Sequence, residues 1–249
     1  HLRHKGRAIS PFDYETLGLE AFPQIFKVKC LNHVFGLSAD DYSRDLDWAP
    51  GFVSIAVVPD LTKLKPGQDL EPRAPVSLLE EIKAYLKTKI SPFVRLKIMN
   101  PRYEKVNLNV RVRLRKGKDK TFYAARLKED LTNLLAPWYI TRDSDKLVFG
   151  QAVSESEVIR YIESLDYVDF ITCLSLSGDE DAPSLLRAIG PVTARSILTA
   201  GEICVVVDED DCARYSDTQP DCFAEAGNEF PFHQICKTPA PPPEEEYGP

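Results

Sequence analysis

Few residues in this sequence have the type and spacing that catalysis requires. The chain has no glycine-rich phosphate loop, no Gly-x-Ser-x-Gly nucleophile motif and no His-Glu-x-x-His zinc motif. Neighbouring carboxylates occur at Asp40-Asp41 and Glu80-Glu81, but adjacent positions on a helix point apart and do not converge on one substrate. We therefore expect no enzymatic activity, no catalytic residue and no cofactor.

The residues that come nearest to a metal site lie close to the C-terminus, at Cys212, Cys222, His233 and Cys236. His233-x-x-Cys236 could supply half of a zinc site, but the spacing between Cys212 and Cys222 fits no usual short zinc knuckle. We expect unconnected thiols here, with zinc as the alternative. The six cysteines are widely spaced in a chain too long to need a disulfide framework, which favours reduced, intracellular thiols.

Charge is the most informative feature of the sequence. Residues 93–118 contain nine basic residues and one acidic residue, a net charge of +8. Arg111, Arg113 and Arg115 alternate with apolar residues along this segment, so they should line one face of a strand. Guanidinium groups on such a face can bind carboxylates or phosphates. A solvated sheet face, an acidic protein partner and nucleic acid are the open interpretations.

The acidic residues are concentrated at the other end of the chain. Residues 203–249 carry eleven acidic and two basic residues, whereas the whole chain has a net charge of −7. The Pro-rich run at 240–246 has no apolar periodicity and should remain extended. No apolar run approaches the ~20 residues of a membrane-spanning helix, so we expect no membrane span.

Apolar periodicity and turn residues predict the elements of the body. Ser10 and Pro11 begin a helix that Pro23 ends, and Ser77 with Glu80 is a candidate capping box. Helices are predicted at 11–22, 75–89, 122–135 and 154–162, and strands at 25–31, 51–59, 93–99, 106–115, 168–175 and 203–207.

This order predicts an α+β fold with two small α+β units, helices on one face of mixed sheets, and no parallel βαβ winding. The predicted units are 1–100 and 101–176, followed by an extended arm and strand at 177–207 and a largely disordered acidic, Pro-rich tail at 208–249. Within the arm, Arg195, Ile197 and Leu198 should be exposed contact residues.

Several short stretches resemble one family in the same order along the chain. Residues 4–15, which include Arg7-Ala8-Ile9-Ser10 and Asp13-Tyr14-Glu15, resemble the opening motif of the phage baseplate J-like family. Residues 50–55, Asn100-Pro101-Arg102-Tyr103 and Phe149-Gly150 resemble later parts of the family. Residues 195–199 resemble the arm of larger J-like subunits in contractile injection systems.

The resemblance implies that this chain is the C-terminal part of a large baseplate wedge subunit of a contractile injection system or phage-tail-like particle. Its implied partners are other wedge subunits, the spike or hub, and sheath or tube proteins, with self-association also possible. Assembly would take place in the bacterial cytoplasm, and the mature particle would be released or docked on a membrane.

Two function classes remain at this stage. In the first, the chain acts by protein-protein docking through Arg111, Arg113 and Arg115 and through the arm residues. In the alternative, the arginine-rich strand belongs to a nucleic-acid-binding α+β module. The acidic tail would compete with nucleic acid for the arginines, so we expect no nucleic-acid partner.

Overall fold

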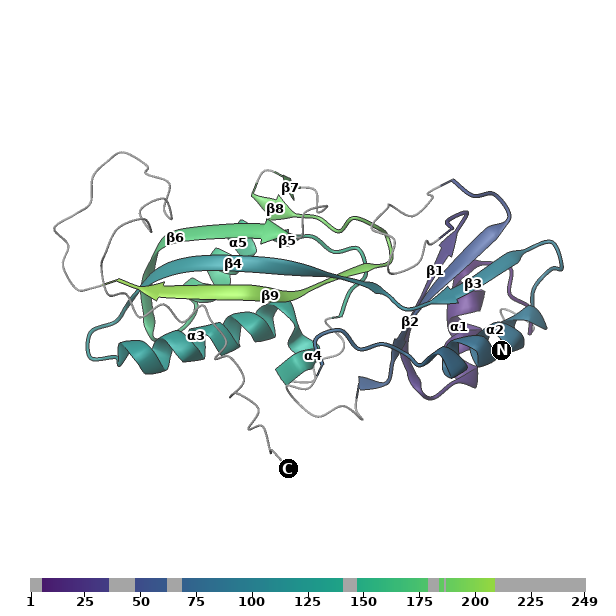
Figure 1. The fold of residues 1–249 in the computed structure, drawn as a ribbon, viewed down its shortest axis with the longest axis horizontal. Helices are drawn as coiled ribbons and strands as arrows, with labels where there is room; N and C mark the ends of the chain where they lie inside the picture. The colour runs from purple at the N-terminus through teal and green to yellow at the C-terminus, as the bar shows by residue number, and fades with distance from the viewer. Residues whose placement is uncertain are drawn as a thin grey trace, which may run out of the picture.

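The computed structural model describes residues 6–35, 48–61, 69–140, 147–178, 184–185 and 187–208. These residues form an elongated molecule with two lobes placed end to end (Figure 1). Each lobe has a three-stranded mixed sheet and its own hydrophobic core, so the predicted α+β class with mixed sheets is confirmed. The boundaries at 100, 176 and 207 stay a prediction.

The first lobe packs two helices against one face of a sheet with strand order β1-β2-β3. Its elements are α1 (Pro11–Ala21), β1 (Ile25–Asn32), β2 (Phe52–Pro59), α2 (Val76–Lys87) and β3 (Arg95–Met99). Alternate residues of β1 and β2, including Val28, Cys30 and Ile55, point towards the helices and meet Leu17 and Ile82 in the core.

The starts of the two helices differ. Ser10 caps α1 as predicted: its hydroxyl accepts a hydrogen bond from Asp13 N, and the Asp13 carboxylate accepts from Ser10 N. The predicted capping box of α2 is wrong, because the N-cap is Pro75 and no side chain caps that helix. Pro75 holds the extended backbone that precedes a helix, and Ser77 already lies inside it.

The expectation of no parallel βαβ winding is also wrong. β2 and β3 pair in parallel, with Ile55 opposite Ile98, and α2 connects them. The connection crosses from one end of the sheet to the other, which a parallel pair requires. The period-2 pattern of the short β3 strand does not indicate which neighbour it joins.

The second lobe has a sheet with strand order β6-β4-β9 and helices on one face (Figure 1). Its elements are β4 (Arg102–Leu114), α3 (Lys120–Leu135), α4 (Pro137–Ile140), β5 (Val153–Ser154), α5 (Glu155–Glu163), β6 (Val168–Gly178), β7 (Ser184–Leu185), β8 (Ala188–Ile189) and β9 (Ser196–Val207). The even-numbered apolar residues of β4, such as Leu108 and Val110, are fully buried against Leu127 and Ile162 of the helices. The predicted alternation of β4 is therefore confirmed.

The prediction of an exposed arm before the last strand is wrong for the described residues. β9 pairs in parallel with β4, from Ser196 beside Arg102 to Val207 beside Val112, so this segment completes the sheet. Its apolar residues fill the same core as β4 because a strand in this place has one face against the helices.

Hydrogen bonds join the two lobes at several points. Tyr103 donates its hydroxyl hydrogen to Pro72 O at 2.8 Å, and Thr199 donates to Leu70 O at 3.2 Å. Lys27 Nζ of the first lobe donates to Leu147 O of the second at 2.5 Å. The segment before α2 therefore runs against the β4 and β9 strands.

The cysteines correct one expectation. Cys173 and Cys204 each take part in a disulfide bond, so the prediction of reduced thiols is wrong for these two residues. Cys30 is free and buried. The candidate metal ligands Cys212, Cys222, His233 and Cys236 lie outside the described residues.

Candidate docking surfaces

The three predicted arginines, Arg111, Arg113 and Arg115, lie in different environments. Arg111 Nε is 3.7 Å from Asp208 Oδ1, and Thr172 donates its hydroxyl hydrogen to Asp208 Oδ2 at 2.5 Å. The Arg113 guanidinium lies over the ring of Phe170, 5.7 Å from its centroid. Arg111 and Arg113 are therefore engaged within the chain, on the sheet face opposite the helices.

Arg115 lies beyond the end of β4 and is exposed. Its Nε donates to Val168 O at 3.1 Å, which holds the base of the side chain against β6. The turn that follows carries more cations, of which Lys116 and Lys120 are exposed and Lys118 is half-buried.

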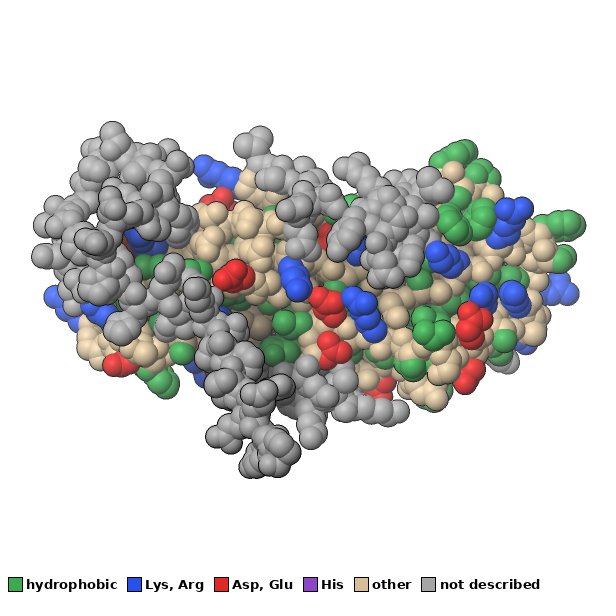
Figure 2. All heavy atoms as spheres, viewed as in Figure 1, with side chains coloured by type: hydrophobic (Ala, Val, Ile, Leu, Met, Phe, Trp, Pro, Cys, Tyr) green, Lys and Arg blue, Asp and Glu red, His purple; other side chains and the backbone are tan. Residues whose placement is uncertain are grey.

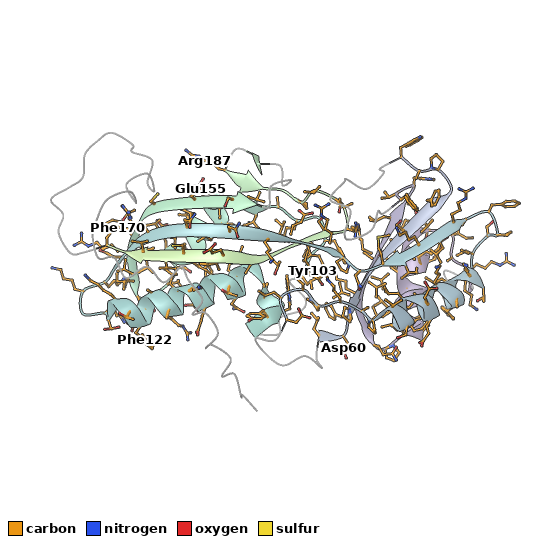
Figure 3. The ribbon with its side chains drawn as sticks, in the orientation of Figure 1. Asp60, Tyr103, Phe122, Glu155, Phe170 and Arg187 are labelled. Atoms are coloured by element: carbon orange, nitrogen blue, oxygen red, sulfur yellow. The ribbon has the colours of Figure 1, made fainter. Side chains whose placement is uncertain are left out.

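We call residues 113–120, which run from the end of β4 to the start of α3, together with Phe122 and Phe170, the distal basic end. Residues 113–120 include five basic residues and one acidic residue, Asp119. Lysine and arginine side chains gather at this end of the molecule (Figure 2), and Phe122 and Phe170 flank it from the helix side and the sheet side (Figure 3). Phe122 is 62% exposed and Phe170 is 43% exposed. Aromatic rings surrounded by cations at a protruding end are suited to protein recognition.

Packed aromatic residues support Phe122 from below. Its ring meets Tyr123 edge to face at 5.1 Å, and Tyr123 contacts Tyr167 at 5.0 Å. Tyr167 donates its hydroxyl hydrogen to Asp130 Oδ2 at 2.7 Å. Burial, followed by the hydrogen bond and negative charge of Asp130, raises the pKa of Tyr167 above its usual value. The phenol therefore stays neutral and keeps donating at physiological pH.

The predicted arm residues Arg195, Ile197 and Leu198 are all buried. Ile197 and Leu198 belong to the core of the second lobe. Arg195 is only 2% exposed, and its carbonyl accepts a hydrogen bond from Arg102 N at 3.4 Å. The expectation that these side chains are exposed is therefore wrong within this chain, and their role as interface residues stays a prediction.

A buried polar cluster lies around Glu104 at the start of β4. The carboxylate accepts from Val192 N at 2.9 Å and from the Ser196 hydroxyl, and it pairs with Arg102 Nε at 3.3 Å. Glu104 is 2% exposed, so each of these contacts is made away from bulk water. No sequence pattern predicts this cluster, because its members are distant in the chain and Glu104 lies within a basic segment.

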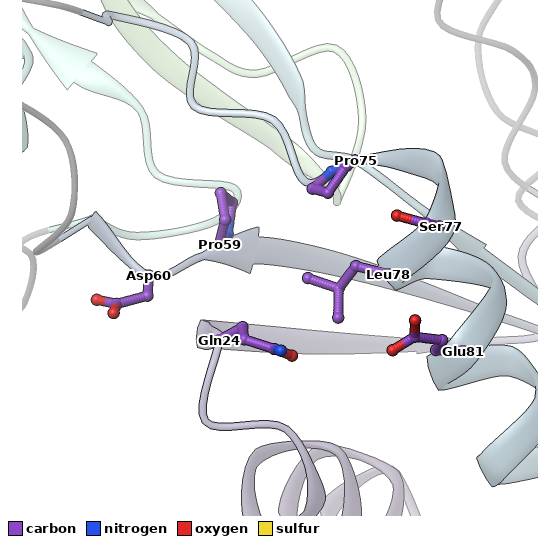
Figure 4. Close-up of a pocket in the computed structure, with 7 residues that line it drawn as sticks. All are labelled: Gln24, Pro59, Asp60, Pro75, Ser77, Leu78 and Glu81. Carbon is purple, nitrogen blue, oxygen red and sulfur yellow. The ribbon is translucent and has the colours of Figure 1, made fainter.

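Among the hollows on the surface of the described residues, two are considered as candidate sites. The first, of about 290 Å³, lies between the ends of β1 and β2 and the start of α2 (Figure 4). Its lining includes Asp60 and Glu81, whereas Glu80 pairs with Lys83 at 3.1 Å, so the two neighbouring glutamates do not converge. The second, of about 770 Å³, is a mostly apolar groove between α3, α4, α5 and the start of β9.

Neither hollow has the residues of a recognisable catalytic or metal site. In the part of the chain that the structure describes, no three His, Cys, Asp or Glu side chains come together in a way that could hold a metal ion. Among the described helices, none is long and apolar enough to cross a membrane.

The comparisons with known proteins agree with an assembly role. A family model described as "Baseplate protein PVC11-like" matches residues 1–191. The chain is a baseplate protein. It belongs to the PVC11-like family of baseplate proteins.

A solved structure shares the fold. A chain of the anti-feeding prophage (AFP) baseplate, determined by cryo-EM with six-fold symmetry imposed, aligns with a TM-score of 0.54 and 20% sequence identity. The alignment covers 80% of this chain and 39% of the AFP chain, so this chain spans about two fifths of its relative. Among curated proteins, none matches this chain.

Proposed function

We propose that this chain is a structural component of a J-like baseplate wedge and acts by docking to neighbouring subunits rather than by catalysis. We infer docking from the exposed residues of the distal basic end. Arg115, Lys116 and Lys120 present exposed positive charge beside two exposed phenylalanines, a combination that fits an acidic protein surface with an apolar centre.

Within the predicted arginine face, we propose that the docking residues lie at the end of the strand rather than along it. Arg111 and Arg113 are held by Asp208 and Phe170, so reversing their charge would also disturb contacts inside the lobe. Arg115 and Lys116 extend into solvent at the turn and are better suited to meet a partner. The neighbouring wedge subunits, the spike or hub and the sheath or tube proteins are the proposed partners, and assembly would take place in the bacterial cytoplasm before release or membrane docking.

Charge reversal tests the proposal directly. The double variant Arg115→Glu/Lys116→Glu should fold normally and reduce incorporation into particles by about tenfold or more, as expected when a few central interface residues supply most of the binding energy. The matched control is Lys29→Glu/Lys87→Glu, which reverses two exposed lysines of the first lobe and gives the same net charge. Equal incorporation of both variants would reject the distal basic end as a docking surface.

The nucleic-acid alternative is tested with the same variants. If the isolated chain binds single- or double-stranded oligonucleotides, and only the Arg115→Glu/Lys116→Glu change abolishes binding, the cations belong to a nucleic-acid site. Absence of binding at physiological salt, together with recovery of tail proteins in a pull-down of the parent protein, would support the baseplate role.

A further inference from the structure

Near the distal basic end, the outer edge of β9 is a strand edge that no other described residue pairs with. β9 is an outer strand of its sheet (Figure 1). At its start, Ser196 O accepts from Gly150 N at 2.9 Å. From Ile203 onwards, no backbone hydrogen bond joins the outer edge to another described residue.

The orientation of each backbone group follows from one hydrogen bond at the end of the strand. Asp208 N donates to Val112 O of β4 at 2.9 Å. Successive residues of a strand direct their N–H and C=O groups to opposite edges. The N–H groups of Ile203, Val205 and Val207 therefore point away from the sheet.

This stretch lacks the features that usually protect a sheet edge. Natural edges are protected by charged residues, prolines or bulges. The edge strand β3 carries Arg95 and Lys97, and β6 has register irregularities and Asp169. By contrast, the sequence Ile-Cys-Val-Val-Val at 203–207 has no charge and no proline, and the β4–β9 register is regular from Ile203 to Val207.

We propose that the edge of β9 at 203–207 accepts an extended segment of a different baseplate subunit as an added strand. Strand addition gives main-chain hydrogen bonds to the groups that no other described residue pairs with. The inference rests on the proposed function, because the added strand comes from a neighbour in the baseplate. Val207 pairs with Val112, next to Arg113, so this edge is continuous with the distal basic end.

Charge at Glu202 favours a different subunit over a second copy. Symmetric antiparallel pairing of two copies about Val205 would place Glu202 opposite Asp208 of the other copy, which is already paired with Arg111 of that copy and offers Glu202 no cation. An added strand with a basic residue at this end would instead meet the exposed Glu202 with opposite charge.

Amide hydrogen exchange measured by mass spectrometry tests the inference without altering the protein. Peptides covering 202–208 are compared between the isolated parent protein and assembled particles, with β4 as the internal control because both of its edges are paired. The amides of Ile203, Val205 and Val207 should exchange rapidly in the isolated protein and at least about 100-fold more slowly in particles.

Three outcomes would overturn the inference. Incorporation into particles without added protection at 203–207 would reject strand addition and leave the proposed function intact. Protection already present in the isolated protein would show that its own chain or a second copy covers the edge. Failure of the wild-type protein to enter particles would overturn the proposed function and this inference together.

A proline variant provides a second test. Val207→Pro removes an N–H that points away from the sheet, and proline is tolerated at such edge positions. Val76→Pro is the matched control, because Val76 is exposed at the first position of α2, where proline is favoured. Both variants should fold, and Val207→Pro should enter particles at least about tenfold less well than Val76→Pro. Equal incorporation would contradict strand addition.

Discussion

Replacing Glu104 with alanine should destabilise the second lobe strongly. The carboxylate is 2% exposed and accepts hydrogen bonds from Val192 N and the Ser196 hydroxyl, while it also pairs with Arg102. Alanine would leave the largely buried Arg102 guanidinium without this counter-charge and two donors without their acceptor. Breaking a buried ion pair in this way costs about 3–5 kcal/mol of unfolding free energy.

The expected shift is large enough to measure by thermal unfolding. For a body of about 150–250 residues, each kcal/mol lowers the midpoint by roughly 2–4 °C, which predicts a decrease of about 6–20 °C for Glu104→Ala. Glu104→Gln keeps the shape and one acceptor oxygen, so it should cost less, about 1.5–3 kcal/mol. Circular dichroism melts of both variants provide the measurement.

An exposed glutamate provides the control for this experiment. Glu163 ends α5 on the surface, and Glu163→Ala should change the unfolding free energy by less than about 0.5 kcal/mol. If Glu104→Ala melts within about 2 °C of the wild type, the polar cluster around Glu104 is not a buried network and the reasoning from its geometry fails.

Three further substitutions test the core, the sheet and the buried thiol. Ile197→Ala should lower the unfolding free energy by about 2–4 kcal/mol in urea titrations, because Ile197 is a core residue; a wild-type midpoint would restore its role as an exposed contact. Gly201→Ala should destabilise the β4–β9 pairing, because its Cβ would lie 2.3 Å from Asn107 Oδ1, which accepts from Glu202 N; an unchanged melting temperature would contradict this. Burial raises the pKa of the Cys30 thiol to about 12. Between the unfolded pKa of about 8.5 and this folded value, unfolding therefore releases a proton. The unfolding free energy then falls by up to about 1.4 kcal/mol per pH unit as the pH rises. Cys30→Val should reduce that slope in urea titrations at pH 8, 9 and 10, and an identical slope would show that the thiol does not contribute.

The sequence determined the local elements because their causes are local. The hydroxyl of Ser10 and the fixed backbone of Pro11 begin α1 wherever the helix lies, and the alternation around Leu108 and Val110 produces a strand with one apolar face. The basic character of residues 93–118 is likewise a property of composition. These features were enough to predict the α+β class and a cationic surface.

Tertiary structure decided which of those features face a partner. Whether Ile197 is an exposed contact or a core residue depends on β9 lying beside β4, a pairing between segments almost a hundred residues apart. The same pairing places Ile203–Val207 at the outer edge of the sheet, and Asp208 engages Arg111 while Arg115 stays exposed. No local pattern encodes these outcomes, because the burial of a side chain and the pairing of a strand edge depend on what the rest of the chain places beside them.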